Sequence, residues 1–171
     1  MFRDNPELLR FVEWIQASST SMALVEVTAD QPLSLLFIQT LHILGVSVII
    51  GAGWLSGVWL LGVVPLRNAL GASPRRLVMA CYPALCVLAL TGLVLIIRRP
   101  DRILLSTSFP IKLVLIAVGL SLMIALDRSL RGDEEYWGRT DARRIQARIL
   151  GLAIIVIWSA TVFAARWIPF A

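Results

Sequence analysis

His42 is the residue of this sequence best suited to chemistry. It is the only histidine, and it lies in an apolar stretch from Leu33 to Leu66 that holds no other ionisable side chain. Eight residues separate it from Ser34, which is about 12 Å along a helix. Ionisable side chains at such depth in a membrane are rare and are candidates for function. The alternative is a structural role, in which a neutral imidazole hydrogen-bonds to a neighbouring helix.

Two cations are predicted on the same side of the membrane as His42. Lys112 begins the third apolar stretch and Arg166 ends the fourth. Each alone is explained by snorkelling, in which a long side chain brings its charge to the lipid headgroups. An imidazole beneath two cations also suits haem b, with His42 as the metal ligand and the propionates paired to Lys112 and Arg166. A quinone head group is the second candidate cofactor, since it accepts hydrogen bonds from such side chains.

A six-coordinate haem needs a second axial ligand level with His42. Counting from the helix ends places three groups at that level, and none is a strong iron ligand: Ala89 to Thr91, Val118, and Ala160 to Thr161. Met79 and Met123 fall toward the opposite side. The remaining interpretations are a five-coordinate haem, a haem shared with a second copy or another subunit, a quinone, or no cofactor at all.

The elements that must position these residues are membrane-spanning helices. Of 171 residues, 58% are hydrophobic and 16% charged, and the mean hydropathy is +0.81. A soluble domain has roughly 25% charged residues, so a water-soluble enzyme is excluded. Four stretches are long enough to cross a bilayer, at about 33–64, 77–97, 109–126 and 149–168. The sequence predicts an all-α fold: an integral membrane four-helix bundle forming one domain over residues 1–171.

A short amphipathic helix is predicted ahead of the first span, over residues 6–17. Asn5 is a suitable cap and Pro6 a suitable first helical residue. Apolar residues recur at helical spacing on one face: Leu8, Phe11, Val12 and Ile15. Such a helix lies on the membrane surface, with Trp14 at the headgroups. The polar run 18–21 is expected to end it, and the next helix is expected to begin at Pro32.

Charges in the connections predict the topology. Nine arginines fall in the first-to-second and third-to-fourth connections, against seven cationic residues on the other side. The positive-inside rule then places both termini outside the cytoplasm. The net charge of +5 is therefore explained by topology, and no nucleic-acid partner is expected. No acidic residue lies within any predicted span, which argues against a proton-coupled transporter.

Glycines, cysteines and tryptophans also occur in the predicted spans. Gly53 and Gly57 have the spacing that lets helices approach closely. Packing within the bundle is the favoured interpretation, with dimerisation or a flat cofactor against the glycines as alternatives. Cys81 and Cys86 point about 140° apart on a helix and are predicted to be packing residues. The tryptophans at 54, 59, 158 and 167 are predicted at helix ends or lipid contacts.

Several short motifs resemble a bacterial family of small four-helix integral membrane proteins of unknown function. They are Thr40-Leu41-His42-Ile43-Leu44-Gly45, Phe109-Pro110-Ile111-Lys112-Leu113 and Ala165-Arg166-Trp167-Ile168. The resemblance implies a four-helix bundle in the bacterial inner membrane, with His42, Lys112 and Arg166 at characteristic positions. It implies no settled activity. The chain departs from the family at Gly57-Val58-Trp59, where relatives tend to have Asp-x-Arg, and at Leu126, where they often have histidine.

These observations favour a small membrane subunit that supports electron transfer, binding haem b or quinone through His42. It is expected to have no catalytic activity alone and to work with another membrane subunit or a second copy of itself. The alternative is an accessory or assembly subunit of a larger membrane complex, without a cofactor of its own. A third hypothesis, an oligomeric channel, requires a polar face through all four helices, for which few hydroxyl side chains are available.

Overall fold

The computed structural model describes residues 5–63, 74–132, 137 and 140–167. Within these residues the chain forms helices and no strand, because lipid offers no partner for an unpaired backbone group. The helices are α1 (Pro6–Gln16), α2 (Ser19–Asp30), α3 (Pro32–Leu60), α5 (Pro74–Arg98), α6 (Pro100–Leu104), α7 (Ser108–Gly132) and α8 (Asp141–Trp167).

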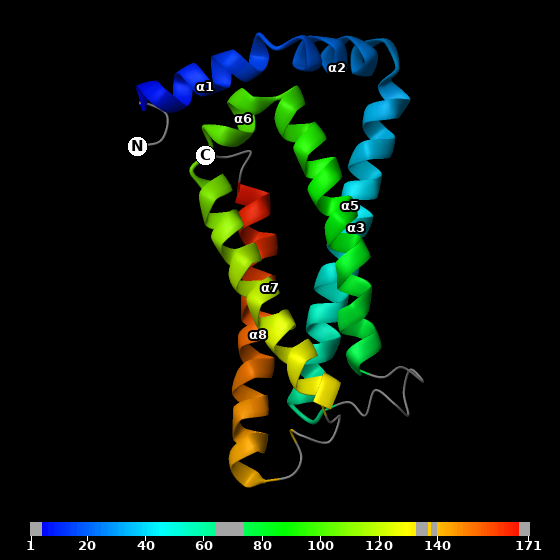
Figure 1. Cartoon of the computed structure of the whole chain (residues 1–171), viewed down its shortest axis with the longest axis vertical. Coiled ribbons are helices and arrows are strands. Elements are labelled where there is room, and N and C mark those ends of the chain that lie inside the picture. The colour runs from blue at the N-terminus through cyan, green and yellow to red at the C-terminus, as the bar shows by residue number, and fades with distance from the viewer. Residues whose placement is uncertain (1–4, 64–73, 133–136, 138–139, 168–171) are drawn as a thin grey trace.

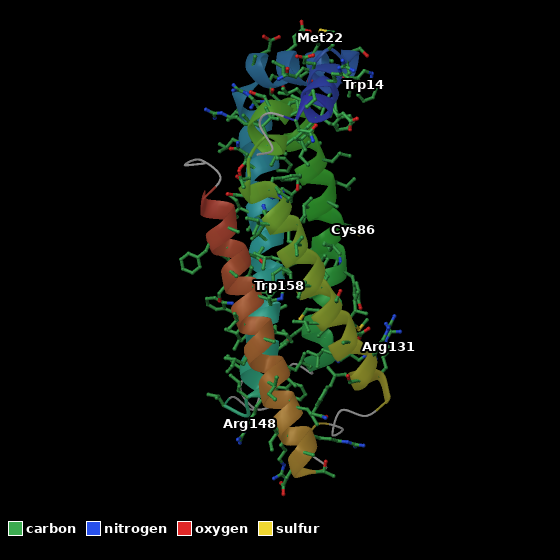
Figure 2. The ribbon with its side chains drawn as sticks, turned by 90° about the vertical axis from the view of Figure 1, so that its left-hand side faces the viewer. Trp14, Met22, Cys86, Arg131, Arg148 and Trp158 are labelled. Carbon is green, nitrogen blue, oxygen red and sulfur yellow. The ribbon has the colours of Figure 1, made fainter. Side chains whose placement is uncertain are left out.

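The predicted membrane helical bundle is confirmed. The four long helices, α3, α5, α7 and α8, are each long and apolar enough to cross a bilayer. Figure 1 shows them running along the long axis, with α1, α2 and α6 gathered at one end. We call that the upper end, and the opposite end, which carries Arg131 and Arg148 in Figure 2, the lower end. Helix α3 packs on α5 and α8, and α7 packs on α8.

The surface helix α1 forms as its sequence predicts. The Asn5 Oδ1 accepts hydrogen bonds from the backbone N–H groups of Glu7, at 3.0 Å, and Leu8, at 3.4 Å. Val12 is buried, whereas Phe11 and Trp14 are exposed and their rings stack. The helix lies across the upper end (Figure 1). Its exposed aromatic side chains are those of Phe11 and Trp14.

A second surface helix, α2, was not predicted. The polar run expected to end α1 instead begins α2, because Ser18 is its N-cap and accepts a hydrogen bond from the Ser21 N–H at 3.2 Å. Two buried hydroxyl groups hold α2 to the end of α5. The Ser21 hydroxyl donates to the Ile97 carbonyl at 2.9 Å, and the Thr28 Oγ1 accepts from the Arg98 Nε at 2.9 Å.

The spans differ from the predicted ranges at their lower ends. Helix α3 ends at Leu60, before the predicted residue 64, and α8 begins at Asp141, ahead of the predicted 149. Helix α7 continues to Gly132, past the predicted end at 126. The apolar run stops at residue 126, but a helix needs only backbone hydrogen bonds to continue. This extension brings Asp127 into the third candidate span, so the expectation that no span contains an acidic residue is wrong.

Glycines bring α3 and α8 into close contact. A Cβ on Gly57 would lie 2.8 Å from the Gly151 carbonyl oxygen, and one on Gly53 would lie 2.5 Å from the Trp158 ring. Gly53 and Gly57 therefore pack within the bundle, with side chains and backbone of α8 lying against them. Trp158 is 3% exposed, so its predicted place at a helix end or in lipid is wrong. Figure 2 shows it midway along α8.

Candidate functional site

His42 lies in the third turn of α3, half-buried, and contacts α5. Its Nδ1 is 2.8 Å from the Thr91 Oγ1, and Thr91 is buried. The Thr91 hydroxyl has a single proton, which it donates to the Val87 carbonyl at 2.7 Å. When the hydroxyl donates to Val87, its oxygen accepts a hydrogen bond from a protonated Nδ1. The imidazole is then the tautomer with a proton on Nδ1 and a lone pair on Nε2.

Gly92 lets the imidazole lie directly on α5. A Cβ at this position would lie 3.4 Å from the His42 Cε1, at the lower limit of ordinary van der Waals contact. The ring is therefore held from two directions, by the backbone at Gly92 and by the hydroxyl of Thr91. A hydrogen bond to the other ring nitrogen fixes the orientation of histidines that ligate metals. A lone pair on Nε2 can ligate a metal or accept a hydrogen bond.

Of the other two predicted site residues, the structure describes the side chain of Lys112 and not that of Arg166. Lys112 lies in the first turns of α7, half-buried, and its ammonium is within electrostatic range of the His42 imidazole. Arg166 belongs to the last turn of α8, but its side chain lies outside the described part of the chain. The roles of Lys112 and Arg166 at the His42 site therefore stay predictions.

The residue that contacts His42 is one that the sequence placed at the same depth in the membrane. Thr91 belongs to the predicted group Ala89 to Thr91, and a neutral hydroxyl is not a strong ligand for haem iron. Among the described residues, no group of three or more histidine, cysteine or acidic side chains is placed to hold a metal ion. Met123 is buried in the hydrophobic core, and Met79 lies near the lower end of α5. Any metal at His42 therefore takes its remaining ligands from elsewhere.

The lower end holds a buried carboxylate that was not among the predicted site residues. Asp127 of α7 is 1% exposed. Its Oδ2 accepts hydrogen bonds from the Arg131 Nε at 2.9 Å, the Arg131 Nη2 at 2.6 Å and the Tyr82 hydroxyl at 3.1 Å. The Arg75 Nε lies 3.9 Å from Oδ1. Asp127 therefore joins α7 to two residues of α5.

One oxygen of the Asp127 carboxylate lacks a hydrogen-bond partner among the described residues. Within the described part of the chain, the buried atoms Oδ1 of Asp127 and Nε of Arg75 have no hydrogen-bond partner. They face each other beyond hydrogen-bonding distance, and one water bound to both would satisfy them. The i,i+4 spacing of Asp127 and Arg131 is visible in the sequence. The contribution of α5 is not visible, because it depends on how two distant helices pack.

Comparisons with known proteins add no further assignment. No protein-family model, curated protein or solved structure matches this chain. The resemblance of its motifs to a family of small four-helix membrane proteins therefore stays a prediction.

Proposed function

We propose that this protein is a small membrane subunit that supports electron transfer by binding haem b or a quinone at His42. The observation that carries the proposal is the chain of hydrogen bonds from His42 through Thr91 to the Val87 carbonyl. With the Thr91 proton donated to Val87, the imidazole carries its proton on Nδ1 and offers the Nε2 lone pair to a ligand. A multi-pass helical bundle without a recognisable catalytic triad or metal cluster among its described residues suits a binding role.

The two candidate cofactors make different demands on His42. Haem iron would take the Nε2 lone pair directly, and its propionates would pair with cations such as Lys112. A quinol hydroxyl would donate a hydrogen bond to the same lone pair. Haem supplies one-electron redox chemistry, and a quinone carries electrons together with protons. In both cases Thr91 keeps the imidazole oriented, and the ammonium of Lys112 favours an anionic group beside it.

A partner is part of the proposal. His42 has one ligand position to offer, and the described residues around it supply no second strong iron ligand. We infer that another membrane subunit, or a second copy of this chain, completes the site. Only 11% to 28% of the most apolar window of each span is buried within this chain, which leaves apolar surface for lipid and for such a partner.

The orientation also belongs to the proposal. Arginines at the lower end include Arg75 and Arg76 of α5, Arg128 and Arg131 of α7, and Arg143, Arg144 and Arg148 of α8. By the positive-inside rule the lower end faces the cytoplasm. His42 is then nearer the outer face of a bacterial inner membrane, with both termini in the periplasm.

An accessory or assembly subunit without a cofactor is the second candidate. The same His42–Thr91 hydrogen bond favours it, since that bond is what a purely structural imidazole would make with a neighbouring helix. The two functions are separated by co-purification. Extraction of the membrane with a mild detergent is expected to yield protein with bound haem or quinone, and His42→Ala protein without it. A stable protein partner with no cofactor in wild-type protein would instead support the assembly role.

A further inference from the structure

A cavity of about 460 Å³ opens at the upper end of the bundle, far from the Asp127 cluster and outside the His42 site. It lies where α2 crosses the end of α5 and the start of α6. Its lining includes two cations, two carboxylates and two apolar side chains: Arg98, Arg99, Glu26, Asp101, Met22 and Val25. Figure 2 shows Met22 on the helices that cover this end. The cavity volume is in the range typical of small-ligand sites.

The four charged groups of the cavity do not neutralise one another. The ion pairs found in the described part of the chain join Asp127 and Asp141 to other arginines. The Arg98 Nε donates to the Thr28 Oγ1 at 2.9 Å, which anchors the guanidinium and leaves its two Nη groups available. Two positive and two negative groups thus line one cavity, each available to a ligand of opposite charge.

The depth of the cavity relative to the membrane indicates the source of its ligand. Arg98 is the last residue of α5, and the third span begins a few residues later at Ser108. This is the depth at which lipid headgroups meet the ends of spanning helices. Met22 and Val25 are 57% and 43% exposed beside the charged groups. Such a mixture of charge and apolar surface matches the junction between a headgroup and its acyl chains.

We propose that this cavity binds a zwitterionic phosphate–ammonium group, supplied by the headgroup of a phosphatidylethanolamine molecule of the bilayer. Arg98 and Arg99 would hold the phosphate through charge-assisted hydrogen bonds. Glu26 and Asp101 would hold the primary ammonium. A phospholipid with a phosphate and no ammonium leaves both carboxylates without a partner. The cavity is therefore expected to prefer phosphatidylethanolamine to phosphatidylglycerol.

The test is thermal unfolding of the full-length protein in detergent with added lipid. Phosphatidylethanolamine is expected to raise the unfolding temperature at a concentration about fivefold lower than phosphatidylglycerol requires. Equal effects of the two lipids would overturn the proposal. Soluble phosphoethanolamine distinguishes the source of the group. If it stabilises the protein as strongly as the lipid does, the assignment to the bilayer is overturned.

Charge-neutralising variants make the test specific. Arg99→Gln is expected to weaken phosphatidylethanolamine binding about fivefold. The double variant Glu26→Gln with Asp101→Asn is expected to reverse the preference, so that phosphatidylglycerol stabilises more than phosphatidylethanolamine. Matched controls are Arg102→Gln and Glu13→Gln, which change charges at the same end outside the cavity lining. If the double variant keeps the wild-type preference, or if the controls have the same effects, the proposal fails.

Discussion

A pair of glycine substitutions in α3 gives the sharpest test of the bundle packing. Gly51 and Gly57 lie in the same helix, and alanine at either position improves helix propensity by up to about 1 kcal/mol. Their surroundings differ. A Cβ at Gly51 meets no atom within 4 Å, whereas one at Gly57 would lie 2.6 Å from the Ile155 Cγ1 and 2.8 Å from the Gly151 carbonyl oxygen. Gly51→Ala is therefore the matched control for Gly57→Ala.

The expected magnitude follows from which atoms are in the way. Ile155 can change its rotamer, but the Gly151 oxygen belongs to the backbone of α8 and cannot rotate aside. Raising a 2.8 Å contact to an ordinary 3.4 Å requires α8 to move by about 0.6 Å. Overpacking of this kind costs typically about 1–3 kcal/mol. Compared with Gly51→Ala, which has the same gain in helix propensity, Gly57→Ala is expected to have a free energy of unfolding lower by about that amount. Gly51→Ala is expected to leave the wild-type value unchanged or raise it.

The measurement is reversible unfolding of the purified protein in mixed micelles, followed by circular dichroism for wild type and both variants. The account requires Gly57→Ala to unfold at lower denaturant concentration than Gly51→Ala. Equal stability of the two variants would show that α3 and α8 do not approach at Gly57 and Gly151, and would refute the packing described here.

Three further predictions concern hydrogen bonds between helices. Thr91→Val removes the acceptor that orients His42 and is expected to weaken cofactor binding about 10- to 100-fold in a titration, while the circular dichroism spectrum stays helical. Asp127→Asn is expected to lower the free energy of unfolding by about 2 kcal/mol and Tyr82→Phe by about 1 kcal/mol, as measured by chemical denaturation. A larger loss in the tyrosine variant would contradict the central position of the carboxylate. Arg98→Gln is expected to speed amide hydrogen exchange in α2 about fivefold and to leave α8 unchanged, since it removes one hydrogen bond that holds α2.

Local signals in the sequence were sufficient for much of the fold. The Asn5-Pro6 start of α1 and the four apolar runs depend on neighbouring residues alone, and the structure contains the corresponding helices. The level of Thr91 opposite His42 also follows from counting along two helices, because the rise per residue is constant. The run 18–21 was misread, because a serine can end one helix and cap the next.

Features that depend on contacts between distant helices could not be predicted. Trp158 is buried because Gly53 and Gly119 leave room for its ring, and neither spacing nor composition shows which helices meet. The Asp127 carboxylate is buried against α5, where the Tyr82 hydroxyl donates to it and the Arg75 Nε lies 3.9 Å away, and this contact is not visible in the sequence. The cavity at Arg98 likewise forms only because α2 folds back across the end of α5.

The central claim is that His42 holds a redox cofactor, and a redox difference spectrum tests it most directly. Protein extracted in mild detergent would be recorded oxidised and after reduction with dithionite, in the visible region for haem and the ultraviolet region for quinone. Ser47→Ala is the matched control, since Ser47 is exposed on the same helix and, among the described residues, its hydroxyl bonds the Ile43 carbonyl alone. The account predicts a difference spectrum in wild type and Ser47→Ala that is lost in folded His42→Ala. A flat difference spectrum in wild type, or an unchanged one in His42→Ala, would contradict it.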